Sequence, residues 1–316
     1  MAAIAFLFPG QGSQRVGMGR DLVTRHPELW DRYYRPADEL LGFELSRLCW
    51  EGPAEELRPT EVTQPAVFLT SLVTLDVLRA HGLEPSFVAG HSLGEYTALV
   101  AAGVLDWRDA LRLVRRRGEL MAAVNERTPG AMAALIGLDP AAVRDICGKA
   151  AAEDGGTVEI ANDNEPEQLV VSGTREAVRL AAAMAREAGA RRVVTLDVGA
   201  PFHCSLMREV EEEFRADLAA VAFRDPVVPV VANATAGYVA DAADAVACLR
   251  RQLAGPVRWT PTLRRLAEDG ADTFVEVGPG KVLTGFARAT LPDIPQFATR
   301  DGRQLDRAVA SLTSML

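Results

Sequence analysis

The pentapeptide Gly90-His91-Ser92-Leu93-Gly94 constrains the fold of this chain more than any other stretch. It follows a short apolar run, Phe87–Ala89, that predicts a buried strand, and it precedes a run over Glu95–Ala102 that predicts a helix. A G-x-S-x-G sequence between a strand and a helix is the pattern of a nucleophile elbow. Such a sharp turn crowds the backbone, so both flanking positions need glycine, and the turn lifts the serine hydroxyl above the sheet edge.

Two interpretations of this pentapeptide are open. Free N–H groups and the helix dipole at a helix N-terminus favour an oxyanion, which makes Ser92 a candidate nucleophile. Alternatively, the stretch is a glycine-rich turn whose serine only caps a helix. The combination of strand, turn and helix favours the nucleophile.

Strands and helices alternate along most of the chain, which predicts an α/β fold with a mostly parallel sheet covered on both faces. Residues 129–197 depart from this pattern. There the expected order is strand, helix, strand, strand, helix, strand, which is the order of a ferredoxin-like unit. The strands are expected over Ala131–Gly137, Thr157–Ala161, Gln168–Ser172 and Arg192–Leu196, and the helices over Pro140–Ala152 and Arg175–Glu187. We therefore predict a large α/β-hydrolase-like domain, residues 1–128 and 198–316, with a small ferredoxin-like domain inserted at 129–197, bordered by Asp197-Val198-Gly199.

Composition excludes several classes of protein. The net charge of −9 argues against a nucleic-acid partner. No apolar run reaches the ~20 residues of a membrane span, and the N-terminus lacks the basic region of a signal peptide. The four cysteines are scattered, with neither C-x-x-C nor metal-ligand spacing, which suits a reducing cytoplasm. We expect a cytoplasmic protein that binds no metal.

A glycine-rich loop follows the first predicted strand at Gly10-Gln11-Gly12-Ser13-Gln14. It fails as a dinucleotide fingerprint because the third glycine would fall at Arg15. It is either a flexible turn or a loop whose backbone N–H groups face a developing anion.

A serine nucleophile needs a general base, and the chain has four histidines. His26 precedes a proline in a polar stretch, His81 ends a predicted helix over Thr63–His81, and the side chain of His91 should point away from that of its neighbour Ser92. His203 follows the last strand of the inserted unit, in the kind of loop where such folds place their chemistry. By elimination His203 is the predicted base, and a backbone carbonyl is the simplest group to orient its ring, because no carboxylate stands out.

Arg117 lies on the apolar face of a helix that begins after Asp106. The stripe consists of Ala110, Leu113, Val114, Leu120 and Met121. An arginine that faces a core needs an anion, because an unpaired buried charge is costly. The anion is either a structural aspartate or glutamate, or a substrate carboxylate gripped by two parallel hydrogen bonds.

Together these motifs resemble the malonyl-CoA:acyl carrier protein transacylases, in order from residue 4 to about 286. The resemblance rests on Gly10-Gln11-Gly12-Ser13-Gln14, Gln64-Pro65, Gly90-His91-Ser92-Leu93-Gly94-Glu95, Arg117-Gly118-x-x-Met121, Pro201-Phe202-His203, Arg251-Gln252-Leu253, Pro256-Val257-Arg258-Trp259 and Glu276-Val277-Gly278-Pro279-Gly280. The combination is far more specific than the pentapeptide alone.

The resemblance implies a two-step transfer through an acyl-serine. Ser92 would attack the thioester of malonyl-CoA, and His203 would take its proton and return it to the leaving thiolate. Arg117 would hold the malonyl carboxylate. The thiol of the pantetheine arm of acyl carrier protein would then receive the acyl group.

The resemblance also implies the groups that support this chemistry. The backbone N–H groups of Gln11 and Leu93 would form the oxyanion hole, and the main-chain carbonyl of Gln252 would orient His203. Phe202, frequent in malonyl-selective acyltransferases of polyketide assembly, would favour a small acyl group. The enzyme would bind no cofactor of its own.

We expect a role in fatty acid synthesis, with a free-standing acyltransferase of a polyketide synthase as the alternative. A serine hydrolase or thioesterase and a non-catalytic binding module are alternatives of other classes. The partner would be an acidic carrier protein that docks on a local arginine patch, and we expect a monomer. The candidate arginines are Arg112, Arg115, Arg116, Arg191, Arg192, Arg250 and Arg251.

Overall fold

The computed structural model describes residues 2–198 and 200–315, so Gly199 at the predicted domain border lies outside the described residues. Sheet A has five parallel strands in the order β10-β9-β1-β2-β7. Its strands are β1 (Ile4–Phe8), β2 (Phe87–Gly90), β7 (Val230–Val231), β9 (Thr273–Glu276) and β10 (Gln296–Ala298). The predicted α/β class with a parallel sheet is confirmed.

Strand β1 lies in the middle of sheet A and is buried on both faces. Because side chains alternate along a strand, Phe6 and Phe8 join one hydrophobic cluster, while Ala5 and Leu7 join the cluster on the other side of the sheet. A continuous apolar strand is what burial on both faces requires.

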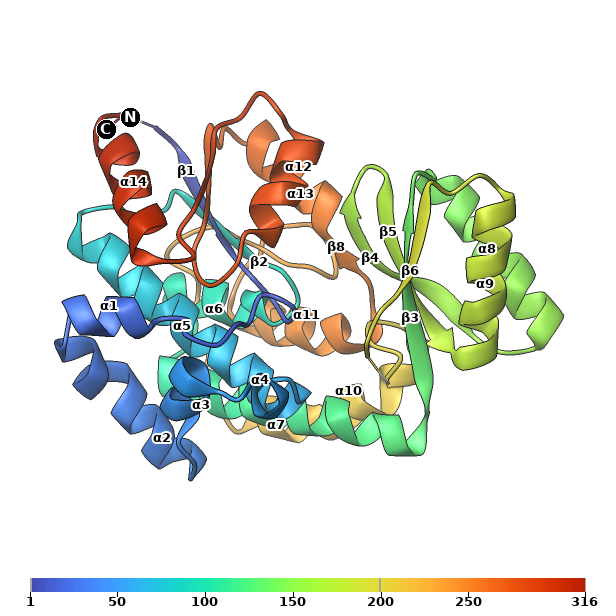
Figure 1. Cartoon of the computed structure of the whole chain (residues 1–316), viewed down its shortest axis with the longest axis horizontal. Coiled ribbons are helices and arrows are strands. Elements are labelled where there is room, and N and C mark those ends of the chain that lie inside the picture. The colour runs from blue at the N-terminus through green and yellow to red at the C-terminus, as the bar shows by residue number, and fades with distance from the viewer. Residues whose placement is uncertain (1, 199, 316) are drawn as a thin grey trace.

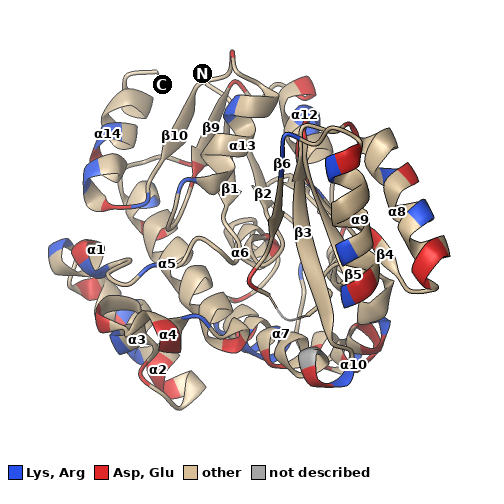
Figure 2. Ribbon diagram, turned by 45° about the vertical axis from the view of Figure 1, so that its right-hand side comes forward, with Lys and Arg blue, Asp and Glu red and all other residues tan. Residues whose placement is uncertain are grey.

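The described helices surround the two sheets (Figure 1). They are α1 (Arg20–Arg25), α2 (Arg35–Leu41), α3 (Leu45–Glu51), α4 (Ala54–Leu57), α5 (Thr60–Ala80), α6 (Gly94–Ala101), α7 (Trp107–Arg127), α8 (Pro140–Asp154), α9 (Arg175–Glu187), α10 (Arg208–Ala219), α11 (Ala242–Ala254), α12 (Trp259–Glu268), α13 (Val282–Thr290) and α14 (Gly302–Thr313). Lysines, arginines and acids gather on these helices, whereas the strands of both sheets are mostly uncharged (Figure 2).

Sheet B forms the smaller part of the molecule, to the right in Figure 1. Its order is β6-β3-β5-β4-β8. The strands are β3 (Gly130–Ile136), β4 (Val158–Glu165), β5 (Gln168–Thr174), β6 (Arg192–Thr195) and β8 (Val257–Arg258). The first four strands with α8 and α9 have the predicted ferredoxin-like order, and the two helices lie on one face of the sheet.

The fifth strand of sheet B was not predicted. β8 belongs to a later stretch of the chain and pairs in parallel with β4, so that Asn162 lies opposite Val257. Two residues are too short to carry a period of alternation. The division of the chain at 128/129 and 197/198 stays a prediction.

The central helix α5 begins at Thr60 rather than at the predicted Thr63, so Pro65 lies inside the helix. Its side chains are buried nearly all round. By length and composition alone α5 is apolar enough to cross a membrane, but 83% of the residues in its apolar window are buried inside the fold, as in a core helix.

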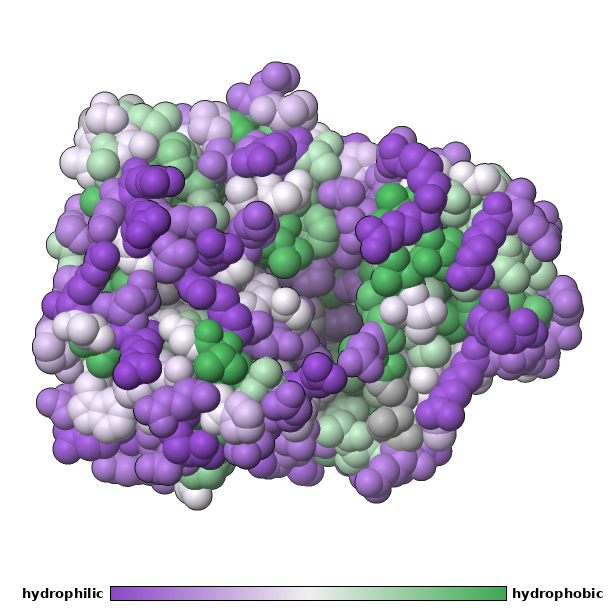
Figure 3. Space-filling model, viewed as in Figure 1, coloured by the Kyte–Doolittle hydropathy of each residue, from purple (hydrophilic) through white to green (hydrophobic). Residues whose placement is uncertain are grey.

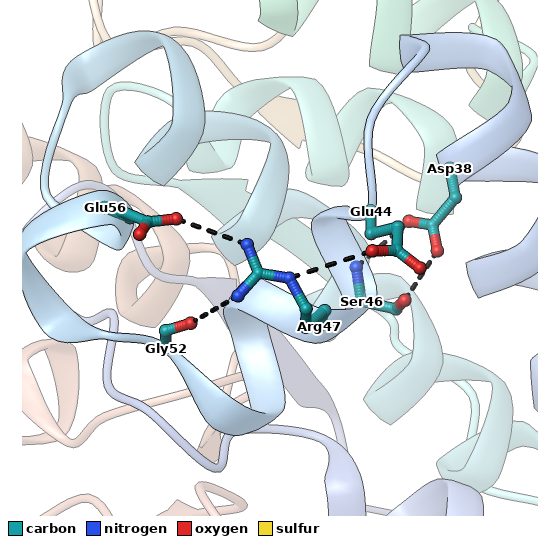
Figure 4. Close-up of polar contacts among 6 residues, drawn as sticks. All are labelled: Asp38, Glu44, Ser46, Arg47, Gly52 and Glu56. Atoms are coloured by element: carbon teal, nitrogen blue, oxygen red, sulfur yellow. Dashed lines mark hydrogen bonds and ion pairs between the residues drawn. The ribbon is translucent and has the colours of Figure 1, made fainter.

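Polar contacts join the short helices that lead to α5 (Figure 4). Asp38 accepts hydrogen bonds from the N–H and hydroxyl of Ser46, and Arg47 donates to the carbonyl of Gly52 and pairs with Glu56 at 3.2 Å. Exposed ion pairs stabilise little by themselves. The contacts nevertheless join α2, α3 and α4, and the segment directly after α4 lines the central cavity.

Candidate active site

The predicted elbow is present between β2 and α6, and its geometry explains both glycines. A Cβ on Gly90 would lie 1.9 Å from the backbone of Gly94, and one on Gly94 would lie 2.0 Å from the carbonyl oxygen of Phe8. Ser92 itself has φ 52°, a conformation that residues with a side chain rarely adopt. The sharp turn therefore exists only because neither flanking position carries a side chain.

The hydroxyl of Ser92 and the ring of His203 are in contact. Ser92 Oγ lies 2.7 Å from His203 Nε2, and His203 Nδ1 lies 2.8 Å from the main-chain oxygen of Gln252. A carbonyl only accepts, so Nδ1 carries the proton and Nε2 is left to accept the proton of Ser92. This pair has the geometry of a nucleophile and its base, with a carbonyl where a hydrolase triad has a carboxylate.

His203 is only 4% exposed, and its surroundings disfavour the imidazolium. Burial, together with the positive charge of Arg117, lowers the pKa of His203 from 6.5 to about 3. The ring is therefore neutral at physiological pH, as a general base must be.

Arg117 is buried at 1% exposure, and its guanidinium reaches the hydroxyl of Ser92. Nη1 donates to Oε1 of Gln64 at 2.8 Å, and Nη2 donates to Ser92 Oγ and to Oε1 of Gln252, both at 3.0 Å. These acceptors are all uncharged, and Nε is buried without a partner among the described residues. The guanidinium is bound by neutral amide and hydroxyl oxygens rather than by a carboxylate, so it can still bind an anion beside Ser92.

The two predicted oxyanion donors lie in two different turns: Gln11 in the loop after β1, and Leu93 directly after Ser92. In the loop after β1, the N–H of Gly12 donates to Oε1 of Gln14, and the N–H of Ser13 donates to the carbonyl of Gly10. Among the described residues, the backbone N–H groups of Gln11 and Leu93 have no such acceptor. Free N–H groups beside a nucleophile are what a developing oxyanion requires.

A cavity of about 640 Å³ lies between the two parts of the molecule, where Figure 3 shows the surface hollowed. It is lined by Gln11, Ser92, Arg117, Phe202 and His203. Its wall also includes Met121, Met132, Asn162, Leu196 and Val198, so both parts contribute. At this wall Arg58 and Asp197 form an exposed ion pair of 3.4 Å.

His91 lies beside the nucleophile in sequence but has different partners. Its Nε2 is 2.8 Å from Oδ1 of Asn164, and its ring packs edge-on against Trp259. Burial lowers the pKa of His91 to about 4. The expectation that His91 and Ser92 point apart agrees with these contacts.

Sequence reasoning missed two residues of the site, Glu95 and Asn233. The N–H of Ser92 donates to Asn233 Oδ1 at 2.6 Å, and the N–H of Asn233 donates to Glu95 Oε2 at 3.0 Å. Glu95 gave only the ordinary signal of an acid in the first turn of a helix, and nothing local distinguishes Asn233 from a loop asparagine. Their roles arise from contacts between residues about 140 positions apart.

Most of the arginines predicted to form a docking patch are already paired with acids. Arg112 pairs with Asp109, Arg115 with Glu119, Arg116 with Asp217, Arg191 with Glu167, and Arg250 with Glu211 and Glu212. Within the described residues, the exposed Arg192 and Arg251 form no ion pair.

Comparison with known proteins finds relatives over nearly the whole chain and solved structures with the same fold. The family described as "Acyl transferase domain" matches residues 5–306. A malonyl CoA-acyl carrier protein transacylase of Bacillus subtilis is 43% identical over 315 residues, which cover 99% of this chain and 98% of that protein. The polyketide biosynthesis protein ThaF of Burkholderia thailandensis is 43% identical over 290 residues, 91% of this chain but 24% of ThaF.

A solved structure, that of a malonyl-transacylase in complex with its type II PKS acyl-carrier protein (PlMCAT:AntF), superposes with a TM-score of 0.94. The two chains are 39% identical, and the alignment covers 98% of this chain and all of that one.

Proposed function

Because the chain belongs to the acyl transferase domain family, we propose that it moves a malonyl group from CoA to the pantetheine thiol of acyl carrier protein. This activity is that of a malonyl-CoA:acyl carrier protein S-malonyltransferase. The observation that carries the proposal is the buried Arg117 guanidinium, 3.0 Å from the Ser92 hydroxyl and without an acid of its own. A cation at that place suits an acyl group that ends in a carboxylate.

The first half-reaction forms an acyl-serine. His203 Nε2 takes the proton of Ser92 as Oγ attacks the thioester carbonyl, and the resulting oxyanion lies near the N–H groups of Gln11 and Leu93. When the tetrahedral intermediate collapses, the C–S bond breaks, and the proton on His203 passes to the departing CoA thiolate. The carbonyl of Gln252 stabilises the charged ring in between.

The second half-reaction reverses these roles. The carrier thiol gives its proton to His203, the sulfur attacks the acyl-serine, and the C–O bond breaks as the proton returns to Ser92 Oγ. Water competes for the same intermediate. The apolar side chains of Met121, Met132 and Phe202 line the cavity and limit the access of water to the acyl-serine. The bulk of Phe202 also favours a small acyl group.

The enzyme needs no cofactor of its own in this scheme, because CoA and the carrier protein both bring pantetheine. The carrier proteins of this chemistry are acidic, so the docking patch would be locally basic. Arg192 and Arg251 are the better candidates for that patch, since the other arginines are already paired. We further propose a monomer that works in the cytoplasm, which the four free, buried cysteines suit.

Fatty acid synthesis is the pathway we propose. A free-standing acyltransferase of a polyketide synthase is the second candidate. It is favoured by the similarity to ThaF and to a malonyl-transacylase of a type II PKS carrier protein. Transfer rates to carrier proteins of both kinds separate the two.

The decisive experiment is intact-mass analysis after mixing the protein with a panel of acyl-CoAs. We expect one malonyl group per chain, absent in Ser92→Ala, with acetyl and methylmalonyl retained far less. Rapid release of free malonate without carrier protein would instead indicate a thioesterase. The absence of any adduct in the parent protein would indicate a binding module.

A further inference from the structure

Both main-chain groups of Ser92 are held by side-chain amides. Its N–H donates to Oδ1 of Asn233 at 2.6 Å, and its carbonyl accepts from Nε2 of Gln252 at 2.9 Å. Asn233 also donates from Nδ2 to the carbonyl of Gly90 at 2.6 Å. Ser92 is in a left-handed conformation, which a residue with a side chain keeps only where its surroundings impose it. The two amides help to impose it, together with the N–H of Glu95, which donates to the Ser92 carbonyl at 3.1 Å.

Both amide residues converge on a single atom, Oε2 of Glu95. It accepts from the N–H of Asn233 at 3.0 Å and from Nε2 of Gln252 at 2.8 Å. Glu95 is fully buried in the first turn of α6, and its other oxygen, Oε1, has no partner among the described residues. One buried oxygen thus anchors both residues that hold the nucleophile.

The same oxygen decides which way the Gln252 amide faces. Oε2 is an acceptor, as is the Ser92 carbonyl, so Gln252 must turn its NH₂ group toward both. Its Oε1 then faces Nη2 of Arg117 at 3.0 Å. If the Gln252 amide were flipped, its Oε1 would face the Ser92 carbonyl oxygen and Glu95 Oε2, and its NH₂ group would face the Arg117 guanidinium.

We propose that Glu95 is a positioning residue for acyl transfer: through Gln252 and Asn233 it fixes the conformation of Ser92 and aims Arg117 at the nucleophile. The inference rests on the proposed function, because its effect is measured as acylation of Ser92. Glu95 does not line the cavity and touches no reacting atom.

The role requires an acceptor atom rather than a negative charge. Burial raises the pKa of Glu95 to about 7, against the hydrogen bonds from Asn233 and Gln252 and the charge of Arg117. A proton on the unpartnered Oε1 would leave Oε2 free to accept the same two hydrogen bonds. A glutamine at this position can likewise present its amide oxygen to both donors.

The test compares Glu95→Gln, Glu95→Leu and Gln252→Leu in quenched-flow acylation by malonyl-CoA and acetyl-CoA. Gln252→Leu keeps the main-chain carbonyl that orients His203 and removes only the amide. We expect the acylation rate of Glu95→Gln to stay within about threefold of that of the parent. Glu95→Leu and Gln252→Leu should each lose roughly 30-fold with malonyl-CoA, and their preference for malonyl over acetyl should shrink.

Glu95 and Gln252 act through the same hydrogen bonds. The acylation rate of the double variant Glu95→Leu/Gln252→Leu should therefore lie within about threefold of the rate of the slower single variant. Losses that multiply would overturn the proposal. Glu95→Asp is the variant to use if Glu95→Leu does not fold. It keeps a buried acid but withdraws it by one methylene from both amides, and full activity in Glu95→Asp would also overturn the proposal.

Glu276 provides the matched control. Like Glu95 it is buried and does not line the cavity, and its Oε1 is unpartnered among the described residues. Its Oε2 accepts from the N–H and hydroxyl of Thr284, and not from Asn233 or Gln252. Glu276→Leu should lower the melting temperature without changing kcat or the malonyl preference. An equal loss of kcat there would assign the effect to general destabilisation. A parent protein that takes up no malonyl group refutes the proposed function instead.

Discussion

Arg117 donates a hydrogen bond from Nη2 to the Oγ of Ser92 across 3.0 Å, so a buried cation contacts the proposed nucleophile. A carboxylate gripped by this guanidinium would stand a fixed, short distance from Ser92. Binding energy at the far end of a malonyl group is thereby converted into orientation of its thioester carbonyl.

Replacing Arg117 with alanine should therefore act on the acyl group selectively. We expect kcat/KM for malonyl-CoA to fall by about 100-fold or more and that for acetyl-CoA to change by less than about fivefold, because only malonyl carries the carboxylate. Steady-state transfer to carrier protein with both donors measures this. Arg117→Lys, which keeps a charge but loses the fork, should fall between the two. Equal losses with both donors would contradict the carboxylate-binding role.

The pH profile should reflect the depressed pKa of His203. Since burial and Arg117 lower that pKa from 6.5 to about 3, the ring stays neutral and competent as a base well below its ordinary pKa. We expect acylation by malonyl-CoA to show no inflection near pH 6.5 between about pH 5 and 8. Quenched-flow rates across that range test this, and a loss of activity centred on pH 6.5 would refute it. Glu95 should add no inflection, because its acceptor oxygen persists in both protonation states.

The free energy of unfolding, unlike the rate of acylation, should depend on the protonation of Glu95. Its pKa is raised from 4.5 in the unfolded chain to about 7 in the folded protein, so the folded state binds the proton more tightly. The corresponding stability is present below pH 4.5 and is lost as the pH rises through 7. Glu95→Gln lacks this titration. Its melting temperature relative to the parent should rise between pH 5 and 8, and a constant difference would argue against a buried, titrating Glu95.

The glycines of the elbow should be irreplaceable, in contrast to a glycine elsewhere. A Cβ on Gly90 would overlap the backbone of Gly94, so Gly90→Ala should give little folded protein. Gly148 lies exposed in helix α8, and a Cβ added there would have nothing within 4 Å, so Gly148→Ala should stabilise the fold by about 0.5–1 kcal/mol. Thermal unfolding of both variants checks the contrast. A stable, active Gly90→Ala enzyme would refute the steric argument.

Charge reversal should separate free arginines from paired ones in carrier-protein docking. Arg192→Glu and Arg251→Glu should raise the KM for carrier protein several-fold while leaving the KM for malonyl-CoA unchanged, because each reversed charge would repel an acidic partner. Arg112 is already neutralised by Asp109 at 2.8 Å, so Arg112→Glu is the control and should have little effect. If all three variants behave alike, the patch lies elsewhere.

Much of the site follows from local sequence. The strand, turn and helix around Ser92 are encoded within residues 87–102, and the helical period alone places Arg117 on an apolar face. The order of elements in residues 129–197 predicts the ferredoxin-like unit, because each helix and strand there is long enough to show its period. The extent of α5 and its burial on all sides were not predictable, since neighbours from several elements cover it.

Local pattern therefore determined which residues are the candidates for the chemistry: a glycine-flanked serine, a histidine after a strand and an arginine on an apolar stripe. Only the tertiary structure decided that Glu95, Asn233 and the side-chain amide of Gln252 form hydrogen bonds around Ser92, and that a two-residue strand from a later stretch of the chain completes sheet B. The physical reason is the sequence separation over which each kind of interaction acts. Steric and periodic preferences act over a few residues, whereas a hydrogen bond between residues 95 and 252 exists only once folding has brought these two side chains into contact.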